Sequence, residues 1–410
     1  MYKMHPWRYW ANLGLVLMAV GFACNLPFNG TNPTPLVEGQ ATIVASSTVV
    51  TPQIETQAKT EIAHGPEGTS TPEPEPDLPM PRYHGFFTLQ NQNFIARDFQ
   101  GNELGIQFPS GTSTWYGDNE VSVLKEAIYY SAMDDSFHVF RVDEEGTRKL
   151  DFIESTDPVS IAVSPDGQLI AWGISRWIDN APQTELYVAN IDGSNLQKVD
   201  QILASDQNDA WFIFHPLQWT ADGKLVYATG MTGIGGYLIF GGYNGLRIYD
   251  PQNDSIDILV SDDEMLGICL SSVSDDISKI AIVCDDTSRA VRVRELSTGI
   301  ETSYEVLPDQ NTSGSAKFSP SGKWLAYVIQ RLNPDDEFGQ VVVTAVDGNA
   351  PPRIIANIVG GTFNIEGWMD DESFLVTRYD IEGNGTQWRM NRTGTDVSQI
   401  ADGFFVGFLP

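Results

Sequence analysis

Cysteine, histidine and basic side chains are scarce in this chain of 410 residues. It has three cysteines, five histidines and 24 Lys or Arg against 54 Asp or Glu, a net charge of −30. Three cysteines are too few for a disulfide-stapled miniprotein or a cysteine-rich zinc scaffold. The excess of negative charge repels polyphosphates, so nucleic acid is not expected as a partner.

Charged residues make up only 19% of the chain, and long heptads of Ala, Glu, Lys and Leu are absent. Coiled coils and large helical bundles are therefore not expected. Instead, 37 glycines and 23 prolines favour β-structure with many turns. Because a usual domain has about 100–200 residues, the length predicts one large architecture with appendages or two domains.

Residues 1–23 have the layout of an export signal. Lys3 and Arg8 precede the uninterrupted apolar run 13–23, which is too short to cross a roughly 30 Å hydrocarbon layer as a stable anchor. The small residues before Cys24 resemble the lipobox of bacterial lipoproteins, and this resemblance implies that Cys24 carries the lipid and attaches the protein to a membrane. An ordinary cleaved signal, with Cys24 as a bystander thiol, is the competing interpretation.

Residues 24–82 are predicted to be a disordered tether after the lipidated cysteine. Ten of the 23 prolines lie in residues 25–82, together with abundant Thr and Glu and few aromatic residues. Such a composition cannot build a packed core. As a flexible coil this segment spans about 40 Å, so we expect it to hold a domain away from the membrane.

Residues 83–410 repeat a four-part pattern. In its clearest copy, short apolar segments at 159–163, 169–172 and 186–191 and a polar one near 197–202 are separated by Pro-Asp-Gly and Asp-Gly turns. Each segment reads as an antiparallel strand. The first turn recurs at Asp166, Asp222, Asp276, Ser321 and Asp371, in steps of 56, 54, 45 and 50 residues. Four strands at this period predict a β-propeller.

The Ser-Pro-Asp-Gly hairpin, the apolar strand after it and the strand ending in Asp-Gly resemble the WD-like propeller repeats of the TolB family. The resemblance covers residues 83–410 and implies an exported protein that works through protein contacts in the cell envelope. TolB-like rings have six blades, whereas seven are counted here. The first blade lacks its innermost strand, which residues 403–410 can supply and so close the ring.

Catalytic and metal-binding motifs are absent from the sequence. It has no Gly-x-Ser-x-Gly nucleophile elbow, no His-Glu-x-x-His zinc motif and no Walker lysine. The acidic pairs do not fit the spacing of a calcium loop. We therefore expect no enzymatic activity, no metal and no cofactor.

Cys269 and Cys284 lie on the first two strands of one repeat. A two-residue turn centred between Asp276 and Ile277 would place them opposite each other and allow a disulfide in an exported protein. A three-residue turn would shift the register by one residue and send the two side chains to opposite faces. Both a disulfide and two reduced thiols are therefore compatible with the sequence.

The connections between the second and third strands of four repeats are enlarged, at residues 175–184, 230–245, 329–339 and 379–385. Exposed aromatic and Arg side chains dominate protein interfaces. The candidates for binding a partner are Arg176, Trp177, Tyr237, Phe240, Tyr243, Arg331, Phe338 and Tyr379. Alternatively, these side chains only cover the ends of the blades.

Together these features predict an exported, monomeric, all-β protein: a seven-bladed β-propeller of four-stranded antiparallel blades, preceded by a signal peptide and a disordered linker. Its expected role is a binding or scaffold module for an envelope protein or a glycan. The alternative is a propeller enzyme or glycan-binding protein with a site at the mouth of the channel, assisted by calcium.

Overall fold

The computed structural model describes residues 83–110, 121–133, 135–178, 181–203, 212–231, 242–262, 269–284, 290–304, 312–330, 338–359, 361–380 and 383–410. They form 28 β-strands, which confirms the expected all-β class. No helix in this part of the chain has the length and apolar character needed to span a bilayer. The predicted signal, Cys24 and the predicted tether lie outside the described residues.

The strands pair in antiparallel groups of four. The first sheet contains β1 (Gly85–Gln90), β2 (Asn93–Arg97), β3 (Glu103–Pro109) and the last strand of the chain, β28 (Phe404–Leu409). The second contains β4 (Val121–Val123), β5 (Ile128–Met133), β6 (Phe137–Asp143) and β7 (Gly146–Ser155). The third contains β8 (Ser160–Val163), β9 (Leu169–Ile178), β10 (Ala181–Asn190) and β11 (Gln197–Leu203).

One sheet departs from the four-stranded pattern. It joins β12 (Phe212–Trp219), β13 (Leu225–Met231), β14 (Tyr243–Asp250) and β15 (Ser255–Val260) to β16 (Leu270–Val273), β17 (Lys279–Val283), β18 (Val291–Glu295) and β19 (Glu301–Tyr304). The junction is the single pair Tyr243↔Leu270 between β14 and β16. This eight-stranded sheet therefore consists of two four-stranded groups that touch at one point.

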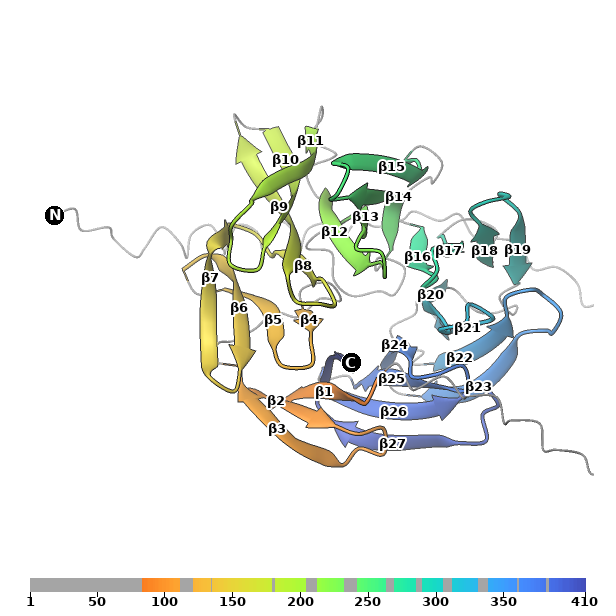
Figure 1. Cartoon of the computed structure of the whole chain (residues 1–410). Helices are drawn as coiled ribbons and strands as arrows, with labels where there is room; N and C mark the ends of the chain where they lie inside the picture. The colour runs from red at the N-terminus through yellow and green to blue at the C-terminus, as the bar shows by residue number, and fades with distance from the viewer. Residues whose placement is uncertain are drawn as a thin grey trace, which may run out of the picture. The chain divides into compact units, whose positions relative to one another are not determined.

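Two further four-stranded sheets complete the described fold. One contains β20 (Thr312–Phe318), β21 (Trp324–Gln330), β22 (Phe338–Ala345) and β23 (Arg353–Val359). The other contains β24 (Thr362–Trp368), β25 (Ser373–Tyr379), β26 (Gly385–Asn391) and β27 (Val397–Asp402). Figure 1 shows the sheets arranged around a common centre, with the first strand of each group toward it, or β28 in the sheet that contains β1.

The turn chemistry of the repeats is local. The Ser164 hydroxyl donates to the Asp166 carboxylate at 2.6 Å, and Gly167 takes a positive φ of 70°. Ser274 donates to Asp276 in the same way at 2.7 Å. The hydrogen bond from Ser164 holds the pKa of Asp166 below its usual value. These aspartates close the hairpins between the first two strands, as the Pro-Asp-Gly pattern predicts.

The core lies between the sheets. Seven clusters of buried side chains occur among the described residues, each shared by neighbouring groups of strands. One joins the last group to the first: Phe86 of β1 packs with Met369, with Leu375 of β25 and with Ala401 of β27. Burying apolar side chains between stacked sheets is the main stabilising contribution in such a fold.

Polar contacts tie the innermost strands to one another. Serine side chains on one innermost strand accept hydrogen bonds from backbone N–H groups on the next. The pairs are Val163 to Ser122 at 3.1 Å, Ala316 to Ser271 at 3.0 Å and Ile365 to Ser315 at 2.8 Å. These bonds satisfy donors that the sheet ladders leave unpaired at the inner edge.

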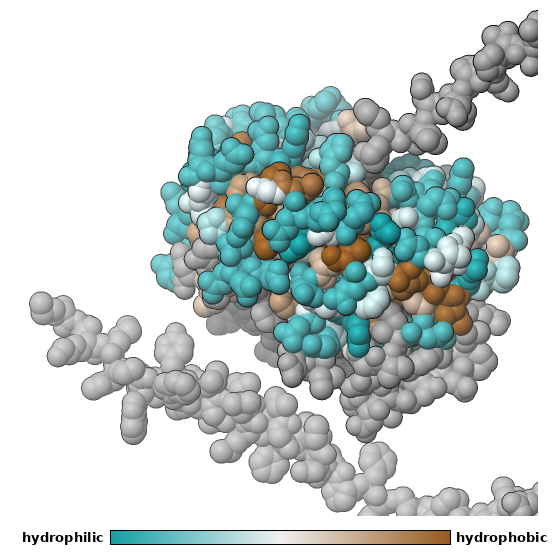
Figure 2. All heavy atoms as spheres, turned by 90° about the horizontal axis from the view of Figure 1, so that it is seen from below, coloured by the Kyte–Doolittle hydropathy of each residue, from teal (hydrophilic) through white to brown (hydrophobic). Residues whose placement is uncertain are grey.

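The surface is dominated by polar side chains. Seven acidic and four basic residues lie in residues 1–82, so residues 83–410 carry a net charge of −27. The face in Figure 2 is mainly hydrophilic, with separate apolar spots. This mixture is ordinary for a solvated exterior.

The first and last strands of the described fold are neighbours. β28 pairs antiparallel with β1 from Gly85↔Leu409 to Leu89↔Phe404, with an irregularity after Phe87. Beyond the ladder, the His84 N–H donates to the Leu409 carbonyl at 2.8 Å. The expected pairing of residues 403–410 with the first blade is therefore present.

Leu409 offers a test of how much this pairing contributes to stability. Its side chain is 6% exposed and packs with the first two sheets, whereas Phe404 on the same strand is 39% exposed. We expect Leu409→Ala to lower the free energy of unfolding by about 3 kcal/mol, because it leaves a cavity in the core. Phe404→Ala should cost less than about 1 kcal/mol. Urea unfolding followed by tryptophan fluorescence measures both, and equal losses would contradict the packing of β28.

Candidate functional site

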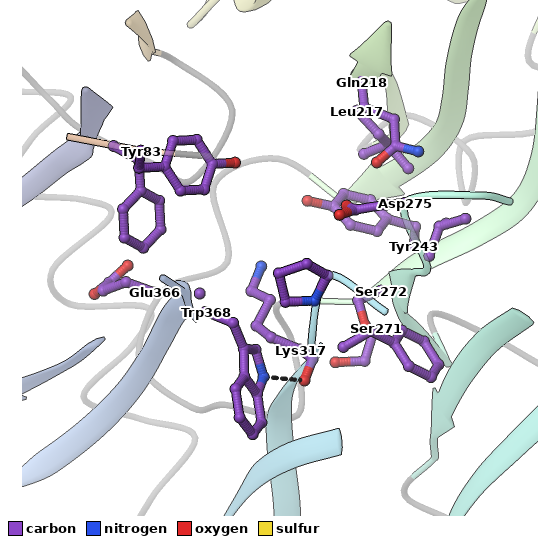
Figure 3. Close-up of a pocket in the computed structure, with 15 residues that line it drawn as sticks. Tyr83, Leu217, Gln218, Tyr243, Ser271, Ser272, Asp275, Lys317, Glu366 and Trp368 are labelled. Carbon is purple, nitrogen blue, oxygen red and sulfur yellow. Dashed lines mark hydrogen bonds between the residues drawn. The ribbon is translucent and has the colours of Figure 1, made fainter. Parts of the chain in front are cut away.

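A cavity of about 220 Å³ lies where five of the innermost strands meet (Figure 3). Each of these strands contributes residues to its wall. They are Leu217 and Gln218 from β12, residues 271–273 from β16, Lys317 and Phe318 from β20, residues 366–368 from β24, and Phe408 from β28. Tyr83, just before β1, completes the wall on the side of β28.

The cavity lies at the end of the strands where the first hairpin of each repeat turns. Leu217, Lys317 and Trp368 are near the ends of their strands, and Asp275 and Pro320 belong to the turns that follow. In an antiparallel group, the connection between the second and third strands is at the opposite end. The cavity therefore lies mainly away from the face formed by the predicted binding loops, and Tyr243 at the start of β14 is the described residue of those loops that reaches it.

Aromatic rings form the walls but are already packed. Trp368 is 3% exposed, and its indole N–H donates to the Lys317 carbonyl at 2.9 Å. Trp219 makes the equivalent bond to the Ala162 carbonyl at 3.2 Å, so this tryptophan contact joins neighbouring innermost strands in two places. Tyr83 and Phe408 stack on each other with ring centroids 4.6 Å apart. The rings thus shape the cavity more than they offer open stacking faces.

Three charged side chains reach the cavity: Lys317, Asp275 and Glu366. Figure 3 shows Lys317 extending into the space, with Glu366 on one side and Asp275 on the other in this view. Among the drawn residues the only hydrogen bond is the one from Trp368 to the Lys317 carbonyl, so none involves the ammonium group. The buried Ser272 hydroxyl has no hydrogen-bond partner within the described part of the chain. The cavity therefore presents both donors and acceptors to whatever enters it.

Tyr243 lines the cavity, and His215 lies behind it. Tyr243 starts β14, and its ring lies 5.4 Å from the His215 ring. The Nδ1 atom of His215 is 3.0 Å from the Ser160 hydroxyl of β8. Burial lowers the pKa of His215 to about 4, so the imidazole is neutral at pH 7. A Cβ atom at Gly230 would lie 2.7 Å from this ring, so the close approach of β13 requires glycine.

The structure brings one of the sequence candidates to the cavity: Tyr243. Arg176 is exposed on β9, with its Nε atom 3.7 Å from a Glu185 oxygen. Tyr379 ends β25 with its ring 6.1 Å from that of Phe404. Trp177 and Phe338 belong to β9 and β22, and their side chains are outside the described part. Tyr237, Phe240, Arg331 and Cys24 also lie outside the described residues.

The prediction that residues 175–184 form an enlarged loop is wrong. Pairing of β9 with β10 continues through Ser175↔Thr184 to Ile178↔Ala181, so these residues extend a hairpin. The Thr184 hydroxyl donates to the Ile174 carbonyl at 3.2 Å and accepts from the Phe214 N–H of the next sheet at 3.2 Å. Polar composition suggested a loop, but here the polar side chains bond to strand backbones.

Cys269 and Cys284 are joined by a disulfide, with Cα atoms 4.7 Å apart. The ladder between β16 and β17 shifts register between Leu270 and Ser272. As a result the Val283 N–H donates to the Cys269 carbonyl at 2.8 Å, and the bridge lies just beyond the ends of both strands. A bulge, which neither of the two simple turn lengths includes, thus sets the position of this crosslink.

No cluster of three or more His, Cys, Asp or Glu suited to a metal ion occurs within the described ranges. The acidic pair Asp370 and Asp371 illustrates why. Asp370 accepts from the backbone N–H groups of Glu372 and Ser373 at 2.8 and 2.7 Å. Asp371 accepts from the Ser321 N–H of the neighbouring hairpin at 3.0 Å. Both carboxylates serve backbone turns.

Sequence reasoning missed Lys317, Asp275, Glu366 and Trp368. They come from three different repeats, and Lys317 stands directly before Phe318 and the turn that begins at Ser319. One signal was available: a charged side chain at the end of a strand expected to line the centre. Two innermost strands, β20 and β24, carry such a residue at the cavity.

Comparisons with known proteins give structural matches only. No protein-family model and no curated protein matches the chain. TolB from Acinetobacter baumannii is 16% identical over 66% of this chain and 64% of its own, with a TM-score of 0.40. A putative TolB from Agrobacterium tumefaciens is 13% identical over 67% and 89%, with a TM-score of 0.38. An oligogalacturonate lyase from Vibrio parahaemolyticus is 13% identical over 76% and 89%, with a TM-score of 0.45.

The match spans slightly less than two thirds of the Acinetobacter TolB chain. At these identities and TM-scores the TolB structures carry nothing about activity or partners. The expectation of no enzymatic activity, which was drawn from missing motifs, is wrong, because an enzyme is among the matches. Missing a serine elbow or a zinc motif does not exclude catalysis from a chain of this kind.

His215 makes stability depend on pH. Its ordinary pKa is 6.5 and its folded value is about 4, so between these values the unfolded chain binds a proton that the folded chain does not. The free energy of unfolding therefore falls as the pH falls through this range. Relative to His215→Gln, we expect the unmodified protein to lose about 2 kcal/mol between pH 7 and pH 4.5.

Urea unfolding at several pH values measures this difference, since carboxylate titration is common to both proteins and cancels. The matched control is His84→Gln, which replaces an exposed histidine. Parallel stability curves for the unmodified protein and His215→Gln would show that His215 is not held neutral in the fold.

Proposed function

We propose that this protein is an exported, lipid-anchored, seven-bladed β-propeller that binds a partner protein of the cell envelope. The binding site is the cavity at the end of the channel. The observation that carries the proposal is the convergence of five innermost strands on one cavity with charged and donor groups. Concave sites where several elements meet are the usual places for ligands.

The arrangement of strands supports seven blades. The eight-stranded sheet divides into β12–β15 and β16–β19, which touch through one pair, so the 28 strands form seven groups of four. Seven buried clusters lie between successive groups. The innermost strands contact one another in succession, from β28 through β4, β8 and β12 and from β16 through β20 to β24. Pairing of β28 with β1 supplies the first blade with its inner strand.

The sequence before the propeller supports the anchor. A basic start, an eleven-residue apolar run and Cys24 have the order of a lipoprotein signal. Two or more acyl chains on the cysteine give stable attachment, since each buried methylene contributes about 0.8 kcal/mol. Residues 25–82 then give the propeller its reach from the membrane.

The shape of the cavity favours a protein segment over a glycan. Trp368 is buried, and Tyr83 and Phe408 use one face of each ring on the other, so a broad stacking platform for sugar rings is lacking. A volume of about 220 Å³ suits one side chain or one chain end. The surrounding hairpin turns leave room for the rest of a partner outside.

The anchor is tested by Cys24→Ser in the source cells. We expect the unmodified chain in the membrane fraction and labelled by radioactive palmitate, and the variant to be unlabelled and released from the membrane. Cys269→Ser with Cys284→Ser is the matched control, because it replaces the two cysteines of the disulfide without affecting Cys24. Label retained by Cys24→Ser would contradict lipid attachment at this residue.

The binding site is tested with Asp275→Trp, which places a large ring at the rim of the cavity. Asp275 is exposed in the turn after β16, and Ala221 is exposed at the equivalent position after β12 but does not line the cavity. Full chains tagged within the tether capture partners from solubilised envelope, and mass spectrometry identifies them. We expect Asp275→Trp to retain at least about tenfold less partner than the unmodified chain, and Ala221→Trp to bind normally.

Purified partner and full chain then give dissociation constants for the three proteins. Equal binding by Asp275→Trp and the unmodified chain would place the site elsewhere. Capture that survives protease treatment and is lost after glycosidase treatment would favour a glycan as the partner.

A further inference from the structure

We infer, on the basis of the proposed function, that the cavity recognises a carboxylate of the partner protein through the Lys317 ammonium group. The carboxylate belongs to a chain end or to an Asp or Glu side chain. It enters beside Ser272 and the stacked pair Tyr83 and Phe408. The inference names the chemistry of the ligand, which the fold alone does not give.

Lys317 is the basis of this assignment. Its side chain is half-buried and extends into the cavity, while its backbone carbonyl is held by Trp368. No carboxylate of the described residues forms a salt bridge with its ammonium group. In a domain with a net charge of −27 most cations have acidic neighbours, as Arg247 has in Asp262 and Arg389 in Asp396. A ligand carboxylate can supply the opposite charge that this half-buried ammonium group lacks among the described residues.

The neighbouring carboxylates do not reverse the preference. Asp275 and Glu366 add negative charge to the cavity wall, but both already take part in interactions within the protein, and the Oε2 atom of Glu366 accepts from the Asn364 amide at 3.3 Å. A cationic ligand would have to enter beside the Lys317 ammonium group. A carboxylate instead gains a charge-assisted hydrogen bond, which is about twice as strong as a neutral one.

The remaining walls suit an apolar body attached to the carboxylate. Phe318, Leu217 and Val273 line the cavity, and Ser272 offers a buried hydroxyl without a partner in the described part of the chain. Lys317 and Ser272 lie on the neighbouring strands β20 and β16. Two donors on adjacent strands match the two oxygens of one carboxylate.

The test uses the full chain in detergent micelles and three small probes at pH 7. N-acetyl-phenylalanine represents a chain end, N-acetyl-glutamate α-methylamide represents an acidic side chain, and N-acetyl-phenylalaninamide lacks the carboxylate. Dissociation constants come from ligand-observed NMR. We expect at least one acid to bind about tenfold or more tightly than the amide. The acid that binds more tightly identifies the source of the carboxylate.

Lys317→Gln and Lys323→Gln each remove one positive charge, so comparing them separates a specific contact with Lys317 from the effect of net charge. Lys317→Gln should reduce the preference for acid over amide to about one, and Lys317→Arg should retain part of it. Lys323→Gln, at an exposed position in the turn after β20 and outside the cavity, should leave the preference intact. Thermal unfolding of each variant confirms that it is folded.

Three results overturn the inference: equal binding of acids and amide, a preference that survives Lys317→Gln, and no binding of either acid. Tighter binding of glucuronate than of both acids, lost in Lys317→Gln, also overturns it and assigns the carboxylate to a sugar. If Asp275→Trp loses the envelope partner and Lys317→Gln retains it, the proposed function is supported and only the inference of carboxylate recognition is rejected. If both variants retain the partner, the proposed function of the cavity is rejected as well.

Discussion

Pairing between the first and last strands is the constraint on which the rest of the domain depends. Until β28 pairs with β1, the inner edge of β1 is open and Phe86 lacks its contacts with Phe405. Closing so long a loop is less costly than its length suggests, because the entropy of closure grows only with the logarithm of the number of residues. The same pairing places Phe408 against Tyr83, so one wall of the cavity exists only once the two ends of the domain have met.

The innermost strands are sheet edges, and their unpaired backbone N–H groups find partners on neighbouring sheets. A strand at an edge carries backbone donors without partners, and near a central channel these donors would rely on water. Here serine hydroxyls from the preceding innermost strand accept from Val163, Ala316 and Ile365. Trp219 and Trp368 add bonds in the same direction, with the indole N–H donating to a backbone carbonyl of the preceding innermost strand. Short polar side chains at the centre therefore hold neighbouring sheets in register without filling the space between them, and this leaves room for a cavity.

Much of the fold could be predicted from the sequence, because its determinants are local and repeated. The hairpin at Ser164 and Asp166, and the pairing of residues 403–410 with the first strand, follow from turn chemistry and from counting strands. The extension of the hairpin through Ser175 and Thr184 was missed, since backbone pairing there overrides a polar composition. The cavity could not be predicted: Lys317 and Glu366 come from different repeats, and only the packing of β20 against β24 brings them to one place.

The charge of the domain and the charge at the centre of the cavity act over different distances. Screening at physiological salt limits the repulsion from a net charge of −27 to about 8 Å beyond the surface. Inside the cavity the nearest charges decide, because fewer water molecules separate them and their interaction is screened less. Under the proposed recognition, the Lys317 ammonium group attracts a carboxylate at short range, although Asp275 and Glu366 line the same cavity. General acidity of the surface then contributes selectivity, since it rejects anionic groups that cannot reach the ammonium group.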